Sequence, residues 1–200
     1  MSKPAQILWL ESVNSTNDWS KEHMSQLLDM SVICAKVQTS GRGQGDHKWH
    51  SEAEKNLLFS ILLKEPSITS NEAFAVSAIS ALALVEVLSK YGIDAKIKWP
   101  NDIYVGDKKI CGLLIEHSLR GSSISWSIIG VGLNVNQTVF PPYLPNPTSM
   151  AIQSGVQNSL KDVLDDFLNI FSRRLEEYTK NGDIKCLRSE FDSFSLALPK

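Results

Sequence analysis

The chain has 200 residues, 42% of them hydrophobic and 21% charged, with 11 glycines and 8 prolines. This composition fits a globular domain and excludes a disordered chain, a collagen-like chain and a small disulfide-stapled module. The 20 basic and 22 acidic residues give a net charge of −2, which argues against binding nucleic acid through a broad basic surface. We expect a cytoplasmic protein without a membrane span, since the sequence has no signal peptide, no Cys-x-x-Cys pair and no run of 18 apolar residues.

Hydrophobic periodicity predicts strands alternating with helices along the chain. Two capping boxes, Ser15 with Asp18 and Thr69 with Glu72, are expected to begin helices, and Gly92 is expected to end the second of these. The expected strands lie at 6–10, 31–37, 56–63, 95–99, 102–105, 110–116 and 124–136, and a strongly amphipathic helix is expected over 160–178.

Turn-forming residues at 106–109 and 119–123 are expected to join neighbouring strands as hairpins, which makes those strand pairs antiparallel. Four prolines within 140–147 predict an irregular loop there. The predicted fold class is therefore α+β, with a mixed, largely antiparallel sheet flanked by helices. We expect residues 1–200 to form a single domain.

The polar, glycine-rich segment 38–49 is the first candidate for a functional site. Its glycines allow backbone amides to approach an anion closely, and Arg42 offers a planar fork of donors for a phosphate or carboxylate. The spacing matches neither a Walker A loop nor the dinucleotide-binding pattern, because Asp46 stands where the last glycine would be. By spacing alone, a mobile surface loop is an equally good interpretation.

Two further segments offer charge to an anion. In Lys98-Trp99-Pro100-Asn101-Asp102, Lys98 could meet a phosphate and Asp102 a metal ion or a nucleotide hydroxyl, although such a segment by itself is more often a plain turn. Lys109 precedes Gly112 on a predicted strand and could point towards the same anion.

Gly130 and Gly132 lie inside a predicted strand, where glycine indicates either a β-bulge or close approach of a ligand. His47 and His50 lack the second ligand pair that a zinc site needs. The sequence also has no serine-hydrolase elbow, and no cysteine lies in a basic setting that would favour a thiolate nucleophile. Without a covalent nucleophile, the gathered cations indicate chemistry on a phosphate or an activated carboxylate.

Together these segments resemble the biotin protein ligases (biotin–[acetyl-CoA-carboxylase] ligase, holocarboxylase synthetase) over about residues 10–150. The matching motifs are Ser15-Thr16-Asn17, the 38–49 segment, Ser51 with Asn56-Leu57, Lys98-Trp99-Pro100-Asn101-Asp102, Lys109-x-x-Gly112-Leu113-Leu114-x-Glu116 and Gly130-x-Gly132-x-Asn134-x-Asn136. Each motif is common by itself, and their combination in this order is specific.

The resemblance implies a fold like that of the class II aminoacyl-tRNA synthetases and a ligase that works in two steps. ATP and biotin, both substrates, would form biotinyl-5′-AMP with the help of Mg²⁺, and the biotin would then pass to a lysine of a biotin carboxyl carrier domain. By resemblance, the catalytic residues are Arg42 and Lys109, and the Mg²⁺ ligand is Asp102. The residues expected to contact biotin are Ser15, Thr16, Asn17, Gln38, Arg42, Gly43, Gln44 and Lys109. Those expected to contact ATP or the adenylate are Lys98, Asn101, Asp102, Gly112 and Asn134, and Trp49 and Trp99 are expected to form an apolar wall.

The chain departs from the family pattern in its glycine-rich segment. Gln44 stands where many members have a second arginine, and Asp46-His47 replaces Gly-Arg, so we expect the adenylate to leak more readily. We also expect no N-terminal DNA-binding domain, no C-terminal β-barrel and no repressor function, with the protein either a monomer or a homodimer. Two alternatives remain at this point: a lipoate or octanoate transferase, and a non-catalytic module that binds biotin or a nucleotide.

Overall fold

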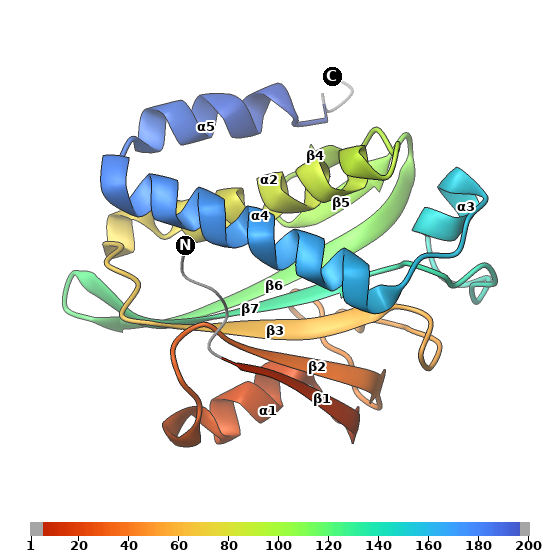
Figure 1. Cartoon of the computed structure of the whole chain (residues 1–200), viewed down its shortest axis with the longest axis horizontal. Helices are drawn as coiled ribbons and strands as arrows, with labels where there is room; N and C mark the ends of the chain where they lie inside the picture. The colour runs from red at the N-terminus through yellow and green to blue at the C-terminus, as the bar shows by residue number, and fades with distance from the viewer. Residues whose placement is uncertain (1–5, 197–200) are drawn as a thin grey trace.

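The computed structural model describes residues 6–196, which are built around a seven-stranded sheet with strand order β1-β2-β3-β7-β6-β5-β4 (Figure 1). Among the described strands, β1 and β2 pair in parallel and all other neighbours pair antiparallel. The strands are β1 (Gln6–Val13), β2 (Ser31–Gln38), β3 (Leu57–Lys64), β4 (Lys96–Lys98), β5 (Asp102–Val105), β6 (Lys108–Arg120) and β7 (Ser123–Leu133). The predicted α+β class with a mixed, largely antiparallel sheet is confirmed.

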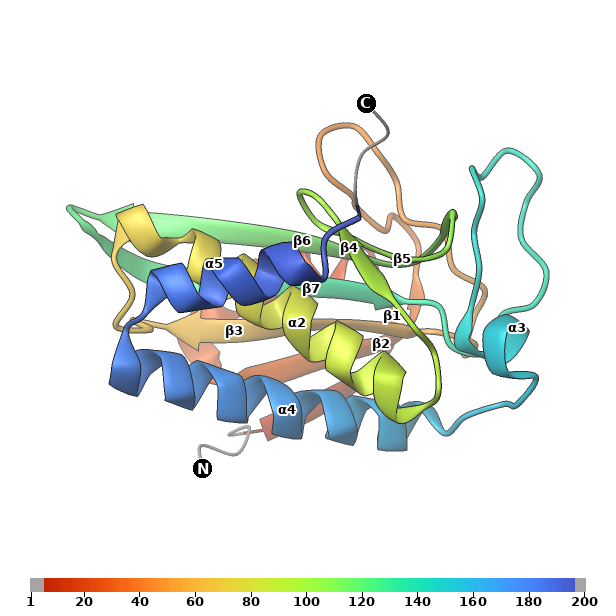
Figure 2. The ribbon, with the colours of Figure 1, turned by 90° about the horizontal axis from the view of Figure 1, so that it is seen from above.

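Helices cover the two faces of the sheet unequally. α2, α4 and α5 pack together on one face, while α1 lies on the other, where it contacts β2, β3 and β7 (Figures 1 and 2). The helices are α1 (Thr16–Glu22), α2 (Phe74–Lys90), α3 (Met150–Ser154), α4 (Leu160–Asn181) and α5 (Ile184–Ser193), with short 3₁₀ turns at Met24–Gln26 and Ser70–Glu72. Because α1 is short, it leaves part of its face of the sheet uncovered.

The main core lies between the sheet and helices α2 and α4. The apolar run of β3 is buried on both faces, and Phe59 from this strand meets Phe167 of α4 with ring centroids 5.3 Å apart. α2 is apolar almost all round, so it can only be stable in such an interior. By length and composition the segment Ser70–Lys90 could cross a membrane, but 67% of its most apolar window is buried inside the protein, as expected of a core helix.

The structure corrects several boundaries predicted from the sequence. The capping box at Thr69 is present, whereas Ser15 caps α1 without a side-chain hydrogen bond, and the Asp18 carboxylate pairs with Arg42. The first helix is also shorter than its apolar stripe suggested, since the chain changes to a 3₁₀ turn at Met24. β1 and β6 are longer than expected, because each extends into segments whose polar residues lie at the sheet surface.

Side chains of β6 and β7 alternate between the two faces, and this alternation places the site. Leu113 and Val131 belong to the main core beneath α2, so Gly112, Gly132 and their alternate neighbours face the side that carries α1. The open part of this face, next to the start of α1, is where the polar motifs of the sequence meet.

Candidate active site

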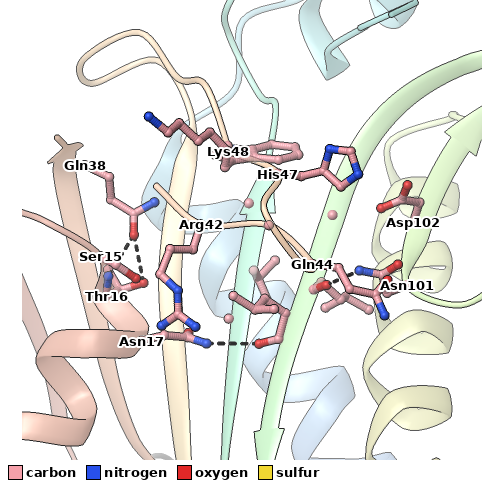
Figure 3. A pocket seen from close by; sticks show the side chains of 18 of the residues that line it. Ser15, Thr16, Asn17, Gln38, Arg42, Gln44, His47, Lys48, Asn101 and Asp102 are labelled. Carbon is pink, nitrogen blue, oxygen red and sulfur yellow. Dashed lines mark hydrogen bonds between the residues drawn. The ribbon is translucent and has the colours of Figure 1, made fainter. Parts of the chain in front are cut away.

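A cavity of about 250 Å³ lies on the α1 face of the sheet (Figure 3). Its walls come from the start of α1, the end of β2, the segment 39–56, the β4–β5 turn and the facing strands β6 and β7. The predicted site residues that line it are Ser15, Thr16, Asn17, Gln38, Arg42, Gly43, Gln44, Trp49, Asn101, Asp102, Lys109 and Gly112. Both predicted cations, Arg42 and Lys109, therefore face one shared cavity.

Buried polar side chains at the α1 end of the cavity form a connected hydrogen-bond network. The Gln38 carbonyl oxygen accepts from the Thr16 backbone amide at 2.7 Å and from its hydroxyl at 3.2 Å, which leaves the Gln38 amide nitrogen free to face the cavity (Figure 3). Ser60 Oγ lies 2.7 Å from Thr16 Oγ1 and 2.6 Å from Asn17 Oδ1. The network fixes the orientation of each amide and hydroxyl before any ligand binds.

Arg42 is held by two carboxylates behind the cavity. Its Nη1 pairs with Asp18 of α1, and its Nη2 lies 3.2 Å from Glu116 Oε1 of β6. Burial raises the pKa of Glu116, but hydrogen bonds from Asn17, Lys21 and Arg42 outweigh it, so the pKa lies below its ordinary value. The carboxylate is therefore ionised at neutral pH and forms a stable anchor for the guanidinium.

The segment around Arg42 is a small hairpin. Trp49 donates its backbone N–H to the carbonyl of Gly41 at 2.9 Å, Gly43 donates to the carbonyl of His47 at 2.7 Å, and Arg42 and Lys48 form a β-bridge between them. The exposed tip at Gln44 is thus carried on a hydrogen-bonded hairpin base.

Trp49 anchors this hairpin on two paired glycines. Gly112 of β6 and Gly132 of β7 are direct cross-strand partners, and a Cβ on Gly132 would lie only 2.5 Å from the Trp49 indole. A Cβ on Gly112 would lie 3.0 Å from the same ring. Only glycine at both positions lets an indole lie flat on the sheet, and the third glycine of this face, Gly130, makes the same room for Asn17.

Lys109 is held between a carboxylate and an aromatic ring. Its ammonium lies 2.7 Å from Asp102 Oδ1 and 5.6 Å from the centre of the Trp49 ring. Asn101 is fixed by a 2.6 Å hydrogen bond from its amide to the carbonyl of Leu113. Trp49 therefore touches both the hairpin that carries Arg42 and the side chain of Lys109.

Three of the residues predicted to form the site lie outside the cavity lining. Trp99 is 71% exposed at the β4–β5 corner, so it adds nothing to the apolar wall. Lys98 stacks on Tyr104 at 4.7 Å, which turns it along the strand pair and away from the cavity. Asn134 is buried directly after β7, where its amide nitrogen donates to the carbonyl of Thr148 at 2.9 Å.

Two buried polar atoms beside the cavity have no hydrogen-bond partner among the described residues: Trp49 Nε1, a donor, and Asn134 Oδ1, an acceptor. Gly132 and Asn134 are two residues apart at the end of β7, and the indole nitrogen lies against Gly132. Unpaired buried groups are costly, so the Trp49 donor at the cavity wall and the Asn134 acceptor behind the lining would each gain from a hydrogen-bond partner.

Sequence reasoning missed several groups at this site. His47 and Lys48 line the cavity, and Asp18 and Glu116 hold Arg42 from behind. The two cavity residues lie within the glycine-rich segment, so that motif could have indicated them. Nothing in the sequence pairs Glu116 with Arg42, because 74 residues separate them.

Comparison with known proteins agrees with this geometry. Residues 9–134, more than half of the chain, match the model of the family described as "Biotin/lipoate A/B protein ligase family". The chain belongs to this family.

Similarity to individual members of the family extends beyond the matched segment. The "Bifunctional ligase/repressor BirA" of Bacillus spizizenii is 32% identical over 173 residues, covering 84% of this chain and 52% of the relative. The "Biotin--protein ligase 1, chloroplastic" of Arabidopsis thaliana is 33% identical over 187 residues, covering 88% and 49%. The chain thus spans about half the length of these relatives. A structure of the biotin protein ligase of Aquifex aeolicus with biotin and ATP is 30% identical, with a TM-score of 0.82 over 97% of this chain and 80% of that one.

Proposed function

We propose that the chain is a biotin–protein ligase catalytic domain. In this proposal it forms biotinyl-5′-AMP and pyrophosphate from biotin and ATP, and then transfers biotin to one lysine of a biotin carboxyl carrier domain. The observation that carries the proposal is the shared cavity of Arg42 and Lys109, with a polar network at one end and an open donor–acceptor pair beside it. We further propose that the domain acts as a single unit in the cytoplasm.

The first step needs positive charge at one point. A carboxylate oxygen attacks the α-phosphorus, an O–P bond forms, and the bond to pyrophosphate breaks with the electron pair going to the leaving group. Because both reactants are anions, cations must offset their repulsion and the charge that builds up on the phosphate. Arg42 and Lys109 are suited to this role because carboxylates already hold them in place, so little ordering is left for the moment of reaction.

The polar end of the cavity suits the bicyclic ring of biotin. The ureido group has N–H donors and a carbonyl acceptor, and the walls offer the free amide nitrogen of Gln38, the hydroxyl of Ser15 and the carbonyl oxygen of Asn17. The flat indole of Trp49 supplies apolar surface for the alkyl chain. At the other end, Asn134 Oδ1 is an unpaired acceptor that suits an amino group of a nucleotide base.

Asp102 fits a Mg²⁺ ion bound together with the phosphates. Mg²⁺ is usually held by one or two carboxylates plus substrate oxygens, and no group of three or more possible metal ligands occurs among residues 6–196. One oxygen of Asp102 pairs with Lys109, and the other has no partner among the described residues. The ion would supply positive charge to the phosphates, and this chain contributes the single carboxylate and the adjacent lysine.

The second step needs protection from water followed by access for a lysine. The 41–49 hairpin lies over the cavity and would shield the mixed anhydride, which water hydrolyses. An unprotonated lysine amine then attacks the acyl carbon, the C–N bond forms, AMP leaves with the electron pair of the C–O bond, and the amine loses its proton to solvent.

The test is exchange of labelled pyrophosphate into ATP by the purified protein, with biotin, lipoate or octanoate as the acid. We expect exchange that depends on biotin, followed by attachment of biotin to a carrier domain. Exchange with lipoate or octanoate but not with biotin would instead support the related acyl transferases. Binding of biotin without any exchange would support a non-catalytic module, and either result would refute the proposal.

A further inference from the structure

A carboxylate outside the cavity connects two of its walls. Glu116 lies on β6, on the same face as Gly112 and Leu114, and its side chain is only 20% exposed. Its Oε2 accepts a hydrogen bond from Asn17 Nδ2 at 2.9 Å, and its Oε1 lies 3.2 Å from Arg42 Nη2. One side chain thus holds a polar group from α1 and the guanidinium from the hairpin.

The contact with Glu116 decides which atom of the Asn17 amide faces the ligand. Both hydrogens of the Asn17 amide are used, one by Glu116 and one by the carbonyl of Leu114 at 3.1 Å. The oxygen is therefore turned to the other side, where it accepts a hydrogen bond from Ser60 Oγ at 2.6 Å and lies against Gly130. Asn17 is 3% exposed and can offer the cavity an acceptor only.

A carboxylate is the group that enforces this orientation. An ionised carboxylate accepts hydrogen bonds and donates none, so a flipped Asn17 would place its oxygen against Glu116 and against the carbonyl of Leu114. A neutral glutamine at position 116 can both donate and accept, so only the carbonyl of Leu114 would then oppose a flipped Asn17. The charge at position 116 and the reach of its side chain therefore both contribute to the hydrogen-bond polarity of this wall.

We propose that Glu116 is a positioning residue that makes the α1 end of the cavity select ligands bearing a ring N–H, while it holds the Arg42 guanidinium at the cavity wall. Glu116 touches no ligand itself and acts through Asn17 and Arg42. Arg42 keeps its Nε–H and one hydrogen on each terminal nitrogen for an anion. The inference deepens the proposed function and rests on biotin being the ligand.

The test compares binding of biotin with binding of carbamate analogues in which one or the other ring N–H is replaced by oxygen. Calorimetry on the Glu116→Gln variant measures affinity without requiring turnover. We expect the Kd for biotin to rise about tenfold, the effect of weakening one charge-assisted hydrogen bond. For at least one analogue the Kd should change less than about threefold, because that ligand lacks the N–H that Asn17 accepts. The preference for biotin over this analogue should therefore shrink, whereas a general loss of structure would weaken both ligands equally.

Two other variants serve as controls for loss of charge. Glu177→Gln removes a glutamate that also lies beside an arginine, Arg173 at 3.4 Å, but on α4 away from the cavity. Lys21→Gln removes the third partner of Glu116 and leaves the contacts to Asn17 and Arg42 in place. Both variants should bind biotin and its analogues as the wild type does.

A second variant covers the case in which Glu116→Gln fails to fold. Glu116→Asp keeps the charge but withdraws the carboxylate by one methylene, so the hydrogen bond to Asn17 lengthens and the preference for biotin should again fall. The inference is refuted if the variants that fold bind biotin with wild-type affinity and keep the wild-type preference for biotin over the carbamate analogues. Wild-type protein that binds biotin but performs no pyrophosphate exchange refutes the ligase proposal alone, and wild-type protein that does not bind biotin refutes both.

Discussion

Replacing Gly132 with alanine tests whether the indole of Trp49 anchors the 41–49 hairpin on the sheet. The new methyl carbon would lie 2.5 Å from Cε2 and 2.7 Å from Nε1 of Trp49. Carbon atoms in contact are normally about 3.5–4.0 Å apart, so the indole must lift by about 1 Å. The hairpin that carries Arg42 must lift with it, because Trp49 bonds to Gly41 at the hairpin base.

Two opposing effects determine how Gly132→Ala changes the free energy of unfolding. Overpacking of this kind destabilises the folded state by about 1–3 kcal/mol, whereas replacing a glycine inside a strand by alanine stabilises it by about 0.5–1 kcal/mol. The net loss of about 0.5–2 kcal/mol corresponds to a fall in Tm of roughly 1–8 °C for a chain of this size. Gly112→Ala should cost less, because its methyl would lie 3.0 Å from the ring, where a small tilt suffices.

Thermal unfolding and biotin-dependent pyrophosphate exchange measure the two consequences. Gly132→Ala should lower the Tm and raise the KM for biotin, and Gly112→Ala should do both to a smaller extent. In a Trp49→Leu background no indole has to move, so Gly132→Ala should lower the Tm little. Equal stability of Gly132→Ala and wild type, or an equal cost in both backgrounds, would refute the anchoring role of Trp49.

Three further predictions concern the cation Lys109, the hairpin tip and the half-buried His117. Lys109→Met should slow pyrophosphate release about 30- to 1,000-fold, or ~2–4 kcal/mol, and near-normal release would show that its assigned role is wrong. Gln44→Arg should lengthen the lifetime of bound adenylate, measured by trapping released intermediate, and equal lifetimes would contradict the expected leak. Burial lowers the pKa of His117 below its ordinary 6.5, so protonation favours the unfolded state, and the free energy of unfolding should fall as the pH drops through 6.5. His117→Gln should flatten this dependence in denaturant titrations, and an unchanged slope would contradict it.

The elements that the sequence predicted well are those whose signals are local. α2 and its capping box, the amphipathic α4 and the hairpin strands each follow from residues within one turn or one strand of each other. The parallel pairing of β1 with β2 was not specified, because it depends on how α1 packs under the sheet. No residue range was predicted for α5, since its ten residues contain few apolar positions.

The site shows the same division between local and distant signals. Arg42, Lys109 and the polar residues around Ser15 were found because each lies in a motif with unusual composition. The contact of Trp49 with Gly132 joins segments 83 positions apart, so the sequence could only indicate that a close neighbour exists at each glycine. Trp99 was expected in the apolar wall but is exposed, because position at a proline corner does not determine which way an aromatic side chain points.

The burial of α2 has a consequence for the life of the protein in the cell. A nascent chain that has reached residue 90 exposes a 21-residue apolar segment, Ser70–Lys90, before β6, β7 and α4 exist to enclose it. During synthesis and after heat shock, self-association through this segment competes with folding. Yield on refolding should therefore fall as protein concentration rises, and this segment offers a binding place to chaperones that recognise apolar segments.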